Sequence, residues 1–188
     1  MSIIFQSLGR TVAAGVALLV LILFGAGLGG DLHLIGMRWL HAMAGVMWVG
    51  LLWYFNFVQI PSMPKIPDEQ KPAIGKVIAP TALFWFRWAA LATVVTGLAI
   101  AFAAGYLVPA LTLTAGVRTI GIGMWLALAM AFNVWFIIWP NQKKALGIVQ
   151  VEPAEKAAAA RFAMLTSRFN TMLSIPMLYC MIAQGNGG

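Results

Sequence analysis

The chain has 188 residues, of which 62% are hydrophobic and 9% charged, with a formal net charge of +7. A soluble domain carries about 25% charged residues, and one of this size has too little interior to bury so much apolar surface. The composition therefore excludes a soluble fold, and the scatter of the 12 basic residues between apolar runs excludes a nucleic-acid partner. The single cysteine excludes an internal disulfide and a Cys-rich metal site.

Five apolar segments are each long enough to cross the hydrocarbon of a bilayer, which takes about 20 residues. In chain order they cover residues 11–29, 35–60, 80–105, 119–139 and 162–184. Polar loops at 61–79 and 140–161 connect spans on one side, and we expect Glu152-Pro153 to begin a helix that continues into the fifth span. The sequence predicts an all-α integral membrane bundle of five transmembrane helices, forming a single domain over residues 1–188.

Basic residues flank the predicted spans unevenly. With the N-terminus inside, the inner side receives Arg10, Lys65, Lys71, Lys76, Arg87, Lys143, Lys144, Lys156, Arg161 and Arg168. The outer side receives only Arg38 and Arg118. Because cytoplasmic segments are enriched in Lys and Arg, we predict a multi-pass protein of the bacterial inner (cytoplasmic) membrane with its N-terminus inside and its C-terminus outside.

The second span contains the residues with the clearest chemical potential. At about 100° per residue, a helix places His41, Gly45, Trp48 and Asn56 on one stripe. A histidine in a membrane helix is expected to face the bundle rather than lipid, and Gly45 leaves room beside the ring. An imidazole nitrogen directed into a slot is what an axial haem ligand requires.

Three interpretations of His41 remain open on the sequence alone. In the first, His41 binds the iron of a b-type haem, with Gly45, Trp48 and Asn56 as further contacts and Arg38 and Arg118 pairing with the propionates. In the second, His41 only bonds a neighbouring helix, and Gly45 allows close packing. In the third, His33, Met37 and His41, spaced by four residues, bind copper, since imidazole and thioether suit Cu(I).

The missing groups also restrict the function. All five acidic residues lie outside the predicted spans, whereas ion-coupled transporters usually need an intramembrane carboxylate. No phosphate-binding loop, GxSxG elbow or HExxH pair is present. We therefore expect neither a conventional secondary transporter nor an enzyme that acts on its own.

Three segments together resemble a known family. They are Trp39-Leu40-His41 with Gly45 and Trp48-Val49-Gly50, the run from Asn133 to Lys143, and Ser167-Arg168-Phe169-Asn170-Thr171 with Ser174-Ile175-Pro176. As a set they are similar to the N-terminal membrane domain of bacterial membrane-bound urate oxidase (urate hydroxylase). That family carries a cytochrome c domain after the membrane part, which implies urate oxidation linked to electron transfer.

The chain departs from that family in two ways. No CxxCH haem-attachment motif is present, so we expect a short form without the cytochrome c domain. Gly121 stands where longer relatives carry a second histidine, so the resemblance implies that a haem on His41 has a different opposite ligand, such as a methionine of another span.

These observations predict a redox protein that holds haem b near the outer leaflet and exchanges electrons with a respiratory partner. The main alternative is a non-catalytic accessory subunit of a larger respiratory or photosynthetic complex. Copper handling and urate oxidation rank lower. The expected partners are the lipid bilayer and either other membrane subunits or a cytochrome.

Overall fold

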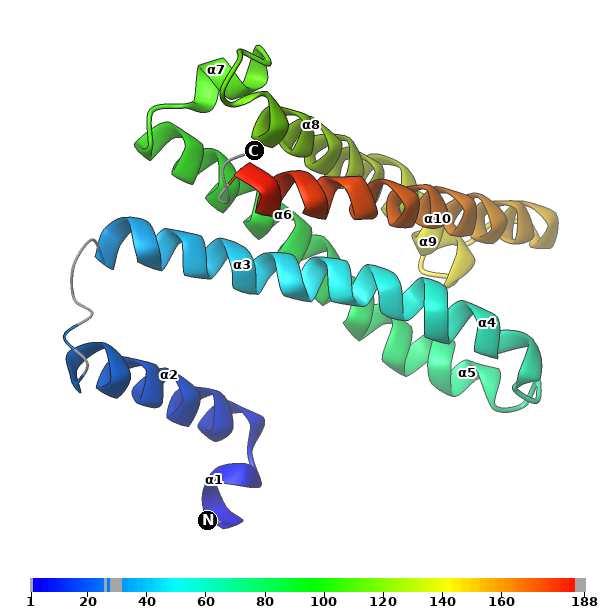
Figure 1. Ribbon diagram of the computed structural model, residues 1–188. Helices are drawn as coiled ribbons and strands as arrows, with labels where there is room; N and C mark the ends of the chain where they lie inside the picture. The colour runs from blue at the N-terminus through cyan, green and yellow to red at the C-terminus, as the bar shows by residue number, and fades with distance from the viewer. Residues whose placement is uncertain (1, 26, 28–31, 185–188) are drawn as a thin grey trace. The chain divides into compact units, whose positions relative to one another are not determined.

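The computed structural model describes residues 2–25, 27 and 32–184, which form helices and turns without a strand in that part of the chain (Figure 1). The chain divides into two compact units, Met1–Gly36 and Met37–Gly188. The end of the first predicted span, residues 26 and 28–29, lies outside the described residues. The predicted all-α class is confirmed for the described residues.

The first unit contains α1 (Ser2–Phe5), α2 (Leu8–Gly25) and the first turn of α3 (Leu32–Trp53). The second unit contains the rest of α3 and everything after it. Its further elements are η1 (Tyr54–Gln59), α4 (Ile60–Ser62), η2 (Met63–Lys65), α5 (Lys71–Ala73), η3 (Ile74–Ile78), α6 (Ala79–Ala103), α7 (Leu107–Leu111), α8 (Arg118–Phe132), η4 (Asn133–Ile138), α9 (Trp139–Ala145) and α10 (Pro153–Ala183).

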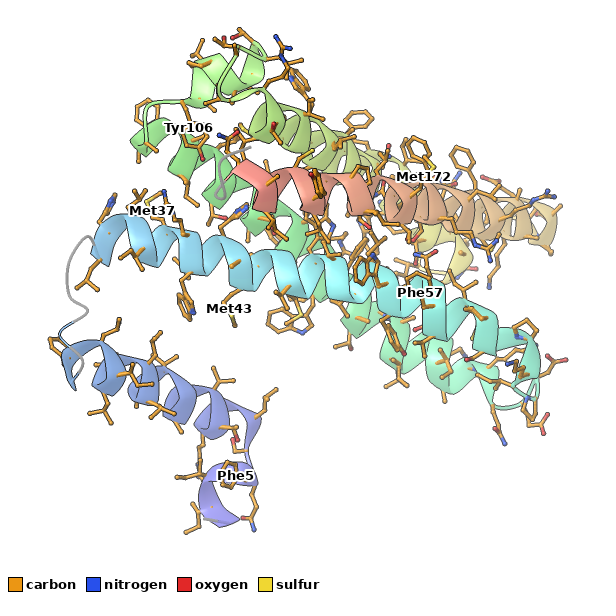
Figure 2. The ribbon with its side chains drawn as sticks, viewed as in Figure 1. Phe5, Met37, Met43, Phe57, Tyr106 and Met172 are labelled. Carbon is orange, nitrogen blue, oxygen red and sulfur yellow. The ribbon has the colours of Figure 1, made fainter. Side chains whose placement is uncertain are left out.

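Four helical stretches are long and apolar enough to cross a membrane: Leu8–Gly25, Leu32–Lys65, Lys71–Ala103 and Arg118–Ala145. Large apolar side chains are exposed along them and along α10, among them Met43, Phe57 and Met172, which Figure 2 labels. A lipid-facing surface explains such exposure, since the surrounding solvent is itself apolar. The described helices are therefore those of a multi-pass membrane protein, and a fifth span stays a prediction.

The helices run further than the predicted spans because three prolines are accommodated by wide π-helical turns. Pro61, Pro80 and Pro140 each stand second after a π-helical segment, namely η1, η3 and η4. In each case the residue before the proline donates its N–H to the carbonyl five residues back. A proline in a regular helix would collide with the preceding turn, and the wider turn avoids that collision. The polar loop expected over 61–79 is thus mostly helical.

A stripe of small polar residues on α10 joins this helix to the rest of the second unit. Asn170 is fully buried; its Nδ2 donates to the Met130 carbonyl at 2.9 Å, and its Oδ1 accepts from Asn133 Nδ2 at 2.8 Å. One turn later, Ser174 Oγ accepts from Trp53 Nε1 at 2.9 Å. Amides and hydroxyls in lipid must find partners inside the bundle. These contacts fix the rotation of α10 against α3, α8 and η4.

Gly121 of α8 lies where α7 folds back onto the bundle. A Cβ at Gly121 would overlap the carbonyl oxygen of Ala110 and lie 2.9 Å from Leu113 Cδ2. Leu113 itself has a φ of 56°, a left-handed conformation that only the surrounding contacts can maintain. This close approach leaves no space for any side chain at 121, a histidine included.

Replacing Gly121 with alanine is expected to destabilise the protein by about 1–3 kcal/mol, because α7 must move to admit the methyl group. Thermal unfolding in detergent measures the effect. Gly75→Ala is the matched control, since a Cβ at Gly75 meets nothing within 4 Å. Equal unfolding midpoints for the two variants would show that α7 can move to admit the methyl group without a loss of stability.

Candidate functional site

The imidazole of His41 is held by the facing helix α6. Its Nδ1 lies 3.0 Å from the Thr93 carbonyl oxygen and 3.1 Å from Thr96 Oγ1. A carbonyl can only accept, so Nδ1 must carry a hydrogen and donate it. The Thr96 hydroxyl donates its own hydrogen to the Ala92 carbonyl at 2.6 Å, and it therefore also acts as an acceptor toward the ring.

These bonds assign the tautomer of His41. With the hydrogen on Nδ1, a neutral ring has its free lone pair on Nε2. No hydrogen bond to Nε2 is present among the described residues, where both bonds of the ring use Nδ1. A histidine that ligates a metal has this same arrangement, with one nitrogen back-bonded to a carbonyl and the other free to coordinate.

Gly97 provides the space in which the ring lies. A Cβ at this position would stand 2.9 Å from His41 Cε1 and 3.3 Å from Nδ1. Gly45, one turn after His41, has a looser environment, since its added Cβ would meet only Thr93 Cγ2 at 3.9 Å. The close backbone approach beside the imidazole is thus made on α6, and Gly97 rather than Gly45 is the residue that allows it.

A cavity of about 500 Å³ lies between α3, α6, α8 and α10. Its wall includes His41, Gly45, Trp48, Thr93 and Gly97, and the rest of the lining is almost wholly apolar. The volume falls within the range of about 300–1,000 Å³ that cofactor and small-molecule sites occupy. Trp48 is fully buried, and its Nε1 donor has no partner within the described structure. An apolar cavity with one free acceptor on its wall is a site for a mostly apolar ligand.

Three methionines complete the far wall. Met124 comes from α8, and Met177 and Met181 come from α10. The sequence analysis expected a methionine of another span as a ligand but did not identify these three. A signal did exist, because Met177 and Met181 continue the α10 stripe of Ser167, Asn170 and Ser174 at intervals of three and four residues.

Three of the predicted contact residues do not line this cavity, namely Asn56, Arg118 and Arg38. Asn56 donates to the Leu52 carbonyl and to Ser167 Oγ, both at 2.8 Å, and so joins η1 to α10. Arg118 Nε donates to the Leu113 carbonyl at 3.2 Å. Their binding roles stay predictions.

Arg38 lies close enough to Tyr106, labelled in Figure 2, to influence its ionisation. Burial raises the pKa of Tyr106 above its usual value, and the positive charge of Arg38 opposes that rise. The Arg38 guanidinium therefore stands near the turn that follows α6, one helical turn before His41 on its own helix.

The residues predicted for copper lie on a single helix. α3 begins at Leu32 and runs through Gly36, so His33, Met37 and His41 follow one another at one-turn intervals. No cluster of three or more His, Cys, Asp or Glu side chains able to hold a metal is found in the described ranges. That finding does not address a site built with a thioether, and copper binding stays a prediction.

Comparison with known proteins gives one family match. Residues 112–186 match the family model described as Urate oxidase N-terminal, which is about two-fifths of the chain. No curated protein and no solved structure matches the chain. The matched segment contains α8 and α10, which supply the methionine wall, whereas His41 lies before it. The chain is thus a multi-pass helical membrane protein that resembles the urate oxidase N-terminal domain over residues 112–186.

Proposed function

We propose that this membrane protein holds a b-type haem in the cavity beside His41 and serves in electron transfer. The observation that carries the proposal is the back-bonded imidazole: Nδ1 donates to the Thr93 carbonyl at 3.0 Å, which leaves Nε2 free at the wall of an apolar cavity. When bound, haem supplies reversible one-electron chemistry. The bond to Nδ1 orients the ring and raises the basicity of Nε2 as a ligand.

A methionine would supply the second ligand in this proposal. Met124, Met177 and Met181 line the same cavity, and a histidine and methionine pair is a known haem ligation that raises the reduction potential. Gly121 has no space for a histidine, which agrees with a methionine in that role.

The topology that goes with this proposal has five spans, with α10 as the fifth. α10 has 31 residues, enough to cross the bilayer, and its stripe of Ser167, Asn170 and Ser174 lowers its hydropathy while facing protein. With the N-terminus inside, His41 stands in the outer half of the inner membrane. Arg38, one turn closer to water, is then placed to pair with a propionate.

A quinol is the second candidate occupant. His41 Nε2 can accept a hydrogen bond, so the cavity offers a partner for the hydroxyl of such a ligand. The almost wholly apolar lining suits a lipid-soluble ring. In that case the protein would bind the donor of electrons rather than carry a haem of its own.

An absorption spectrum separates these proposals. Protein purified from cells with ample haem is expected to show a Soret band that His41→Ala abolishes, because the substitution removes the ligand. His33→Ala, which changes the only other histidine, is the control and is expected to keep the band. A colourless wild-type protein, or an undiminished band in His41→Ala, would reject haem ligation by His41.

A further inference from the structure

Two positive charges lie near one indole ring, and one of them, Arg87, stands six residues before Thr93 on α6. The Cζ of Arg87 stands 3.3 Å from the centroid of the Trp139 ring, and Lys143 Nζ stands 5.8 Å from the same centroid. Neither cation forms a salt bridge among the described residues, whereas Lys71 pairs with Asp68 and Lys144 with Glu155. The ring attracts both cations, but it does not neutralise them.

Buried hydrogen-bond donors without a partner lie beside Arg87 and Trp139. Arg87 Nε and Nη1 and Trp135 Nε1 are buried and lack a hydrogen-bond partner in the described structure. Trp135 lies one turn before Trp139, and its ring contacts that of Trp88, the neighbour of Arg87, at 5.5 Å. All three unpaired atoms are donors. The cluster thus combines positive charge with donors that the protein does not satisfy, which favours an anionic acceptor at the accessible part of Arg87.

The surroundings indicate where that anion comes from. Arg87 Nη2 is not among the buried unpaired donors, so this nitrogen is the part of the guanidinium that an acceptor at the surface can reach. The α6 side chains beside it, Phe84, Trp85 and Trp88, are about half exposed. Tryptophan rings are enriched at the membrane–water interface, and basic pockets between transmembrane helices bind anionic lipid headgroups.

We propose that Arg87, Lys143 and Trp139 form a binding site for the phosphate of an anionic phospholipid, on the inner face in the orientation given above. Arg87 Nη2 donates to a phosphate oxygen in a charge-assisted hydrogen bond. Lys143 adds a second charge, and the exposed aromatic rings of α6 pack against the acyl chains. The site is separate from the cavity of His41 and does not depend on what occupies it.

Thermal unfolding of the full-length protein in detergent tests this site. Added phosphatidylglycerol is expected to raise the unfolding midpoint at an at least tenfold lower concentration than phosphatidylcholine, because two basic groups near a membrane contribute about 1 kcal/mol each toward anionic lipid. Arg87→Gln/Lys143→Gln is expected to lose this preference. Lys65→Gln/Lys76→Gln removes the same charge from two exposed lysines and is expected to keep it. Inorganic phosphate at equal concentration is expected to have no effect.

Several results would overturn the proposal. The first is a preference for phosphatidylglycerol that survives in Arg87→Gln/Lys143→Gln. The second is an equal loss of this preference in the Lys65→Gln/Lys76→Gln control. The third is stabilisation by inorganic phosphate alone. If the double variant does not fold, Lys143→Gln alone serves, since Lys143 lies on the short helix α9 and only its side chain contacts the Trp139 ring. A preference unchanged in Lys143→Gln then counts against the site.

Discussion

Alanine at position 97 is expected to weaken haem binding about ten- to hundredfold, the range seen when the supporting contacts of a metal-ligating histidine are lost. The added Cβ would stand 2.9 Å from His41 Cε1 and 3.3 Å from Nδ1. The ring must move away from α6, and its bond to the Thr93 carbonyl breaks. Haem titration of the purified apoprotein, followed at the Soret band, measures the change in affinity.

Gly50→Ala is the matched control for this substitution. Gly50 also lines the cavity, yet a Cβ there meets nothing within 4 Å. The control is expected to bind haem as the wild type does. Equal affinities in Gly97→Ala and Gly50→Ala would show that the close contact with α6 does not position the imidazole.

Loss of the Asn170 amide is expected to weaken the packing of α10 against its neighbouring helices. Asn170→Ala removes two interhelical bonds and leaves the Asn133 side-chain amide without its partner, whereas the Met130 carbonyl keeps the bond from the Asn133 backbone N–H. Hydrogen bonds between membrane helices are worth about 0.6 kcal/mol on average, and each buried group left unpaired adds to that loss. We expect a total loss of about 1–3 kcal/mol, measured by unfolding in mixed micelles.

Thr166→Ala tests whether this effect is specific. Thr166 is on the same helix, but it is only partly buried, and its hydroxyl donates to the Phe162 carbonyl of its own helix. Its substitution is expected to change stability little. If Asn170→Ala were as stable as Thr166→Ala, the polar stripe of α10 would not hold the bundle together.

Hydropathy was enough to find most of the helices, but not to find how they end. The apolar runs predict α2, α3, α6 and α8 because lipid selects for long uninterrupted stretches. The prolines at 61, 80 and 140 were expected to begin or end helices, yet the π-helical turns before them allow the helices to continue. A turn geometry of this kind depends on backbone bonding that composition does not reveal.

The sequence predicted the site residues on α3, but it did not predict which residues of other helices would contact them. The stripe on the second span identified His41, Gly45 and Trp48, all of which line the cavity. Thr93 and Gly97 were not identified, because a threonine and a glycine in an apolar helix are ordinary residues until a partner is known. Asn56 shares the stripe but bonds Ser167 instead, since the stripe is longer than the cavity.

A structure of the protein purified with haem tests the central claim most directly. The account predicts iron bound to His41 Nε2 inside the cavity of α3, α6, α8 and α10, with Nδ1 still donating to the Thr93 carbonyl. Iron bound through another residue, or a cavity filled by lipid while haem lies elsewhere, would contradict it.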